Sequence, residues 1–137
     1  MSFDCFEYLT LAQQLAGKTL LSASEESRLR SAISRGYYAA FILARNYLRD
    51  YEEIIIPVRQ THQFVITQFK YSPDLVKQGI GKDLSRLRFN RNQADYDDRI
   101  DNLPAITTRV LKLAEKVIFD LERLASPSKA PFNRSES

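Results

Sequence analysis

The stretch SASEESRLRSAISRGYYAAFILARNYLRD, residues 22–50, decides the fold class of this 137-residue chain. It opens with Ser22 and Glu25 at the spacing of a capping box, in which the two side chains satisfy free amide groups at a helix start. Apolar and small residues then recur at spacings of three and four, the period of one helix face. They are Leu29, Ala32, Ile33, Gly36, Tyr37, Ala40, Phe41, Ala44 and Leu48. So wide a stripe predicts one long helix that packs against several others.

Similar patterns on both sides of this stretch predict the other helices. A first helix is expected at residues 3–16, and Thr61 is expected to cap a third helix that residues 72–74 kink or end. The glycines at 79 and 81 predict a break before a fourth helix at residues 82–92. A fifth helix is expected from about residue 101 to 125, with Pro104 in its first turn.

The connection at residues 51–59 contains the apolar run Ile54, Ile55 and Ile56. The run has the composition of a strand, but the chain offers no second strand to pair with it. We therefore expect a buried loop.

Together these elements predict an all-α fold, an antiparallel up-and-down bundle of about five helices over residues 1–125. The length suits one domain with its own core. Residues 126–137 are polar and carry Pro127 and Pro131, so they are expected to form a disordered tail.

Several classes of protein are excluded by what the sequence lacks. Cys5 is the only cysteine, so no internal disulfide or cysteine-based zinc site is expected. No glycine-rich phosphate loop or His/Cys cluster is present, so neither a cofactor nor a metal is predicted. The chain lacks a signal peptide and any apolar run long enough for a membrane span, which favours a cytoplasmic protein.

The strongest local charge signal lies between residues 77 and 91. The formal net charge is only +3, but in this segment Lys77, Lys82, Arg86, Arg88 and Arg91 oppose the single carboxylate of Asp83. One interpretation is a surface that pairs with the acidic stretch at residues 95–101. The other is RNA binding, since arginines bind phosphates through paired hydrogen bonds and aromatic rings stack on unpaired bases.

Under the second interpretation, Arg86, Arg88 and Arg91 are the candidate RNA-binding residues, beside the aromatic residues Phe89 and Tyr96. Arg88 and Arg91 are neighbours across one helical turn, whereas Arg86 points elsewhere. We therefore expect Arg88 and Arg91 to act as a pair and Arg86 to be peripheral. The alternative for Arg91 is an ion pair with Asp95, four residues later.

His62 is the only histidine. A catalytic arrangement would need a nucleophile close to it, and no nucleophile motif surrounds the serines or Cys5. A structural role in the first turn of the third helix is therefore the favoured interpretation, and its role otherwise stays open.

Two motifs carry a family resemblance. The stretch SRGYYAAF at residues 34–41 and the stretch RFNRNQADYD at residues 88–97 together resemble the HEPN family of small helical domains. Thr61 and His62, at the start of the helix between them, also fit that pattern. The resemblance covers most of residues 1–125.

The HEPN resemblance implies a helical bundle that commonly dimerises. The wide apolar stripe, and the close helix contact that Gly36 and Ala40 permit, also favour a homodimer. Many members are metal-independent RNA-cleaving toxins, and others are partners of small nucleotidyltransferases in toxin–antitoxin pairs. Cleaving members use an arginine, a short polar spacer and a histidine. Arg88 or Arg91 matches that arginine, but Ala94, Asp95 and Tyr96 stand where the histidine is expected.

Three functions follow as hypotheses. The first is an interaction module of a toxin–antitoxin or defence system, with a homodimeric chain and a nucleotidyltransferase antitoxin as partner. The second is a metal-independent endoribonuclease with a variant catalytic set of Arg91, Asp95 and Tyr96. An ordinary aspartate is a weak base and a tyrosine is mostly protonated at neutral pH, so this set lacks the proton acceptor of the family. The third is an RNA or nucleotide binder without catalysis.

Overall fold

The computed structural model describes residues 22–126, and four helices make up most of them. These are α2 (Ala23–Tyr51), α3 (Thr61–Lys70), α4 (Leu75–Tyr96) and α5 (Leu103–Ala125). No strand occurs within the described range, so the all-α prediction is confirmed there. The helix expected at residues 3–16 and nearly all of the expected tail lie outside the described residues. The count over the described part is therefore four helices and not five.

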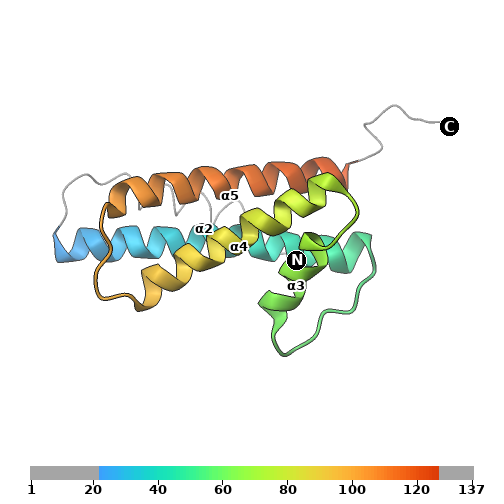
Figure 1. Cartoon of the computed structure of the whole chain (residues 1–137), viewed down its shortest axis with the longest axis horizontal. Coiled ribbons are helices and arrows are strands. Elements are labelled where there is room, and N and C mark those ends of the chain that lie inside the picture. Colours follow the sequence, from blue (N-terminus) through green and yellow to red (C-terminus); the bar gives the residue numbers. More distant parts are fainter. Residues whose placement is uncertain (1–21, 127–137) are drawn as a thin grey trace.

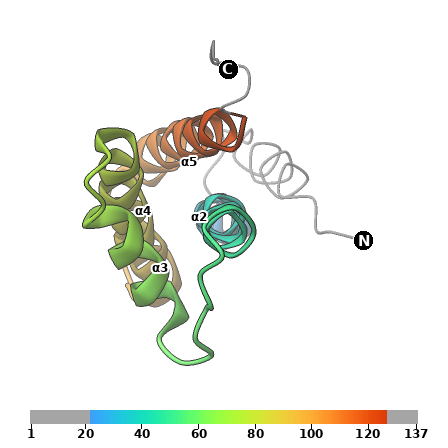
Figure 2. The same ribbon diagram turned by 90° about the vertical axis from the view of Figure 1, so that its right-hand side faces the viewer.

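The three long helices alternate in direction along the chain. In Figure 1, α2 and α5 run the same way side by side, and α4 runs back across them in the opposite direction. Figure 2 looks along α2 and shows α5 and α4 on two of its sides, with the short α3 next to α4. This alternation agrees with the expected up-and-down bundle, and it brings the start of α2 close to the end of α4.

Helix α2 is the central element, as the sequence predicts. The hydroxyl of Ser22 accepts a hydrogen bond from the backbone amide of Glu25 at 3.2 Å, which caps the helix start. All nine residues of the predicted stripe are buried. The stripe packs against both α4 and α5, which explains its width.

The small residues of the stripe serve a contact within the chain. A Cβ atom added at Gly36 would lie 2.9 Å from the Cδ2 atom of Leu111 on α5. Glycine therefore lets α2 and α5 approach closely. Helix α5 of the same chain covers this part of α2, so the stripe gives no argument for a homodimer. The homodimer stays a prediction that rests on the family resemblance.

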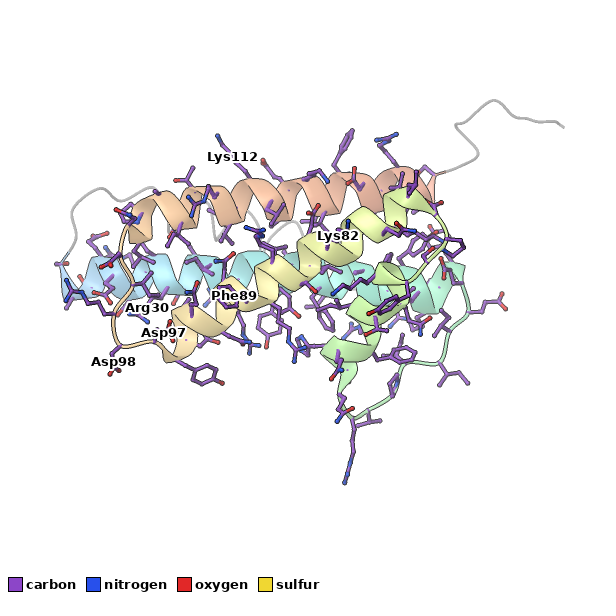
Figure 3. All side chains as sticks on the ribbon, in the orientation of Figure 1. Arg30, Lys82, Phe89, Asp97, Asp98 and Lys112 are labelled. Carbon is purple, nitrogen blue, oxygen red and sulfur yellow. The ribbon has the colours of Figure 1, made fainter. Side chains whose placement is uncertain are left out.

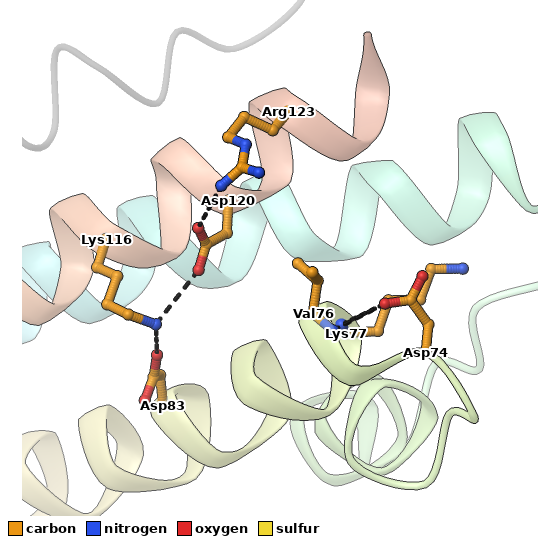
Figure 4. Close-up of polar contacts among 7 residues, drawn as sticks. All are labelled: Asp74, Val76, Lys77, Asp83, Lys116, Asp120 and Arg123. Atoms are coloured by element: carbon orange, nitrogen blue, oxygen red, sulfur yellow. Dashed lines mark hydrogen bonds and ion pairs between the residues drawn. The ribbon is translucent and has the colours of Figure 1, made fainter. Parts of the chain in front are cut away.

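The predicted break at the glycines before residue 82 was wrong. Helix α4 begins at Leu75 and continues without interruption through Gly79 and Gly81. Asp74 caps it, since its carboxylate accepts hydrogen bonds from the amides of Val76 at 2.8 Å and Lys77 at 3.3 Å. This cap is drawn in Figure 4.

Gly81 lies where α4 touches α3. A Cβ atom at this position would lie 2.4 Å from the backbone nitrogen of Lys70, far inside contact distance. The glycine therefore marks a close approach of two helices and not the end of one.

Two smaller expectations also need correction. The N-cap of α3 is Gln60, in a left-handed conformation with φ 54°, and not Thr61. Thr61 is the first helical residue, and its hydroxyl donates to the carbonyl of Pro57 at 2.8 Å. In the connection before it, the expected buried loop is only half buried: Ile54 packs against the core, as Ile56 does, whereas Ile55 is 90% exposed.

Arg30 ties the end of α4 to the start of α2. Its guanidinium donates hydrogen bonds to the backbone carbonyls of Ala94 at 3.0 Å, Asp97 at 2.6 Å and Asp98 at 3.3 Å. Glu26, one turn earlier on α2, pairs with the same guanidinium. Figure 3 shows Arg30 beside Asp97 and Asp98 at this end of the bundle. The otherwise unpaired carbonyls at the helix end are thereby satisfied.

Candidate nucleic-acid interface

Three helices bring aromatic and basic side chains together in what we call the basic–aromatic cluster. It consists of Tyr37 and Tyr38 from α2, His62 from α3, and Arg88 and Arg91 from α4. Tyr37 belongs to the buried stripe of α2, and His62 lies in the first turn of α3. The two arginines are one turn apart on α4, as their spacing predicts.

His62 is packed tightly between aromatic rings. Its imidazole stacks on Phe41, with ring centroids 4.0 Å apart and planes 6° from parallel. Its Nδ1 atom lies 2.6 Å from the hydroxyl of Tyr37. This packing agrees with the structural role expected for the histidine, and it also holds the ring in one orientation beside the two arginines.

The surroundings keep His62 neutral near pH 7. Burial and, to a smaller extent, the positive charges of Arg88 and Arg91 together lower its pKa to about 4. Burial also raises the pKa of Tyr37, so its phenol retains the proton. A protonated phenol donates hydrogen bonds better than it accepts them, because the oxygen lone pairs are partly delocalised into the aromatic ring. We therefore assign the proton of this contact to Tyr37, which leaves an N–H group on Nε2 of His62.

Arg91 is held by contacts on two sides. Its Nη2 atom donates to the hydroxyl of Tyr38 at 2.9 Å, and the guanidinium lies 5.1 Å from the centroid of the Tyr38 ring. Its Nε atom lies 2.9 Å from Oδ2 of Asp95, an ion pair without hydrogen-bond geometry. The alternative expected from the i,i+4 spacing, an Arg91–Asp95 pair, is therefore present.

The predicted catalytic set is only partly assembled. Arg91 and Asp95 lie together, whereas the Tyr96 side chain is 76% exposed at the last residue of α4. Tyr96 is thus a surface ring and not a partner of the other two.

A pocket of about 450 Å³ adjoins the cluster, between α3 and α4. Arg88 belongs to both, so the two features are continuous. Tyr71 and Phe89 present aromatic rings that are 77% and 63% exposed. The pocket thus combines two cations, two aromatic rings and two side-chain amides: Lys70 and Arg88, Tyr71 and Phe89, and Gln63 and Asn92.

Arg86 is separated from these residues. It lies in a different groove, between α4 and α5, as expected from a residue that points away from Arg88 and Arg91. Of the three predicted RNA-binding arginines, two therefore come together and one does not.

Sequence reasoning did not place His62, Lys70 and Tyr71 with the arginines. All three come from the neighbourhood of α3, which is separated in sequence from Arg88 and Arg91. The one signal that linked them was the position of Thr61 and His62 at a helix start in the HEPN-like pattern.

Comparison with family models, curated proteins and solved structures gives no match to this chain. Between residues 22 and 126, no helix has the length and apolarity of a membrane span. Within the same range, no group of three or more His, Cys, Asp or Glu side chains is arranged to hold a metal ion.

We expect acid to destabilise the protein through His62. The pKa of this histidine is about 4 in the folded state, against a usual value of 6.5 that the unfolded chain retains. Between these values the unfolded state binds a proton that the folded state does not, so stability falls as the pH drops from about 6.5 to about 4. His62→Gln should make the free energy of unfolding depend less on pH in this range. Urea unfolding at several pH values measures this dependence in both proteins.

The carboxylates are the same in both proteins, so their contribution cancels in the comparison. Since the chain has one histidine, its imidazole can also be followed directly by NMR. An imidazole that titrates near its usual pKa would contradict the assignment.

Proposed function

We propose that this chain is a HEPN-like interaction module that binds single-stranded RNA without cleaving it. The observation that carries the proposal is the continuity of the α3–α4 pocket with the basic–aromatic cluster through Arg88. The choice of RNA over DNA rests on the HEPN resemblance, as does the setting, a toxin–antitoxin or defence pair with a nucleotidyltransferase partner.

The chemistry of the pocket suits an unpaired strand. Lys70 and Arg88 supply positive charge for phosphates, and the Nε atom of Arg88 is buried without a hydrogen-bond partner among the described residues. Phe89 and Tyr71 offer ring faces on which bases stack irrespective of sequence. Side-chain amides can bond base edges that a duplex would hide.

The state of His62 favours binding over cleavage. A ribonuclease of this kind needs a group that takes the proton of a ribose 2′-hydroxyl. With Tyr37 donating to Nδ1, the Nε2 atom carries a hydrogen and acts as a donor, which suits a phosphate oxygen. We therefore expect labelled RNA to stay intact during long incubation with the purified protein.

Binding should depend on Phe89 and Arg88. Phe89→Ala should weaken the binding of a labelled oligouridine of about 10 nucleotides at least fivefold, since base stacking contributes about 1–3 kcal/mol per base. Arg88→Ala should weaken it about tenfold and reduce the dependence of affinity on salt. Fluorescence anisotropy at several salt concentrations measures both effects.

The chain provides matched controls for each change. Phe119 is also an exposed phenylalanine, on α5, and Phe119→Ala should leave RNA affinity within about twofold. Arg86→Ala should do the same, because Arg86 lies in the other groove. Arg91→Ala should lower both RNA affinity and the melting temperature, because Arg91 also holds Asp95 and Tyr38. Absence of RNA binding by the unmodified protein would overturn the proposal.

A further inference from the structure

A second groove lies between α4 and α5, and the RNA proposal makes no use of it. It encloses about 530 Å³. Its floor is apolar and comes from Ile106, Val110 and Leu113, which follow one another at spacings of four and three along α5. Val110 is buried, whereas the other two are only partly covered by the rest of the chain. An apolar strip is thus accessible along this face of the bundle.

The rim of the groove carries positive charge that the described residues do not neutralise. Arg86 on α4 and Arg109 and Lys112 on α5 are exposed, and none of the three has an ion pair with another residue of the 22–126 range. Figure 3 shows Lys112 projecting from the outer side of α5. The groove therefore combines an apolar floor with a rim of cations that have no ion pair among residues 22–126.

Another lysine of the groove is neutralised and marks one end of it. The Nζ atom of Lys116 lies 2.9 Å from Asp83 on α4 and 3.3 Å from Asp120 on α5, as Figure 4 shows. This pairing bridges the two helices. The contrast with Arg86, Arg109 and Lys112 indicates that those three cations are not needed to hold the bundle together.

We propose that this groove docks an acidic amphipathic helix from a partner protein. The lining residues of α5 extend from 106 to 116, a rise of about 15 Å, which matches about three turns of a bound helix. Apolar side chains on one face of the partner would cover the floor, and flanking carboxylates would meet Arg86, Arg109 and Lys112. This is the helix-in-groove mode of recognition, with charge complementarity to set the orientation.

A protein segment fits this groove better than RNA does. The described residues that line it include no aromatic ring, so bases would find nothing to stack on. A phosphate backbone would use the cations but would leave the apolar floor uncovered, whereas an amphipathic helix uses both. This inference rests on the groove alone and holds whether or not the chain binds RNA.

The test uses a labelled synthetic peptide of about 12 residues, with leucines on one helical face and glutamates beside them. We expect anisotropy to detect binding that weakens with salt. The double variant Arg109→Glu with Lys112→Glu should lose at least tenfold in affinity for this peptide. Both side chains are exposed and unpaired among the described residues, so the helical circular dichroism and the melting temperature should be unchanged.

Three controls make the result specific. Arg59→Glu with Arg99→Glu changes the net charge equally at two exposed residues away from the groove, and should leave peptide affinity within about twofold. A peptide with serines for leucines should bind much more weakly, and so should one with lysines for glutamates.

Any of four binding results would overturn the inference. They are failure of the acidic peptide to bind, equal loss in the control double variant, full binding by the serine peptide, and loss of oligouridine binding when Arg109 and Lys112 are reversed. Light scattering on the same variants tests whether a second copy of this chain occupies the groove. If the unmodified protein is a dimer and only the Arg109→Glu, Lys112→Glu variant is a monomer, the groove is a homodimer interface. That result would overturn the proposal of a partner helix.

Discussion

Gly81→Ala is expected to lower the free energy of unfolding by about 3 kcal/mol or more, even though alanine is the better helix former. The added methyl group would lie 2.4 Å from the backbone nitrogen of Lys70 and 2.5 Å from its Cα atom. A flexible side chain could move aside, but the atoms in the way belong to the backbone of α3. Helices α3 and α4 would have to separate, and the α3–α4 pocket would open with them.

The neighbouring glycine provides the control. Gly79 lies in the same helix, and nothing is within 4 Å of a Cβ atom added there. Gly79→Ala should therefore raise the free energy of unfolding by about 0.4–1 kcal/mol, as alanine reduces the freedom of the unfolded chain. Urea unfolding followed by circular dichroism measures both variants. Equal effects of the two changes would show that α3 does not approach α4 at Gly81.

Phe41→Ala is expected to cost about 3–5 kcal/mol of stability. The ring is only 3% exposed and stacks on His62 at 4.0 Å and on Tyr37 at 5.8 Å between centroids. Its removal leaves a cavity beneath the histidine. The pKa of His62 should then rise toward its usual value, because the burial that lowers it is reduced.

Phe119→Ala is the control, because it removes a phenylalanine ring that is 58% exposed on the surface of α5. Its effect on stability should stay within about 0.5 kcal/mol. Chemical denaturation and an NMR titration of the single histidine measure the two consequences of the Phe41 change. A small cost for Phe41→Ala would put the buried face of α2 in doubt.

The elements that could be predicted from the sequence are those with a local cause. The stripe of α2 follows from a period that any buried helix face must have, and Ser22 caps the helix through contacts three residues away. The start of α5 has the same kind of local signal in Pro104.

The largest error arose where a residue distant in sequence decides the outcome. Two glycines in three residues predict a break, but the contact that requires Gly81 is with Lys70 on another helix, which no local pattern reveals. In the candidate site, too, local features could be predicted and contacts between helices could not. Arg88 and Arg91 could be paired from their spacing on one helix, whereas their proximity to His62 depends on how α3 packs against α4.

The contacts of Arg30 have a consequence for how this chain can diverge. All three of its bonds to the end of α4 and the following turn go to backbone carbonyls, at residues 94, 97 and 98. Every amino acid has such a carbonyl, so the contact does not depend on which side chains the turn carries. Asp97 and Asp98 are exposed, so we expect substitutions of their side chains to leave these contacts intact as long as position 30 remains an arginine. A single arginine on α2 would then hold in place a turn that is distant in sequence, whatever side chains that turn carries.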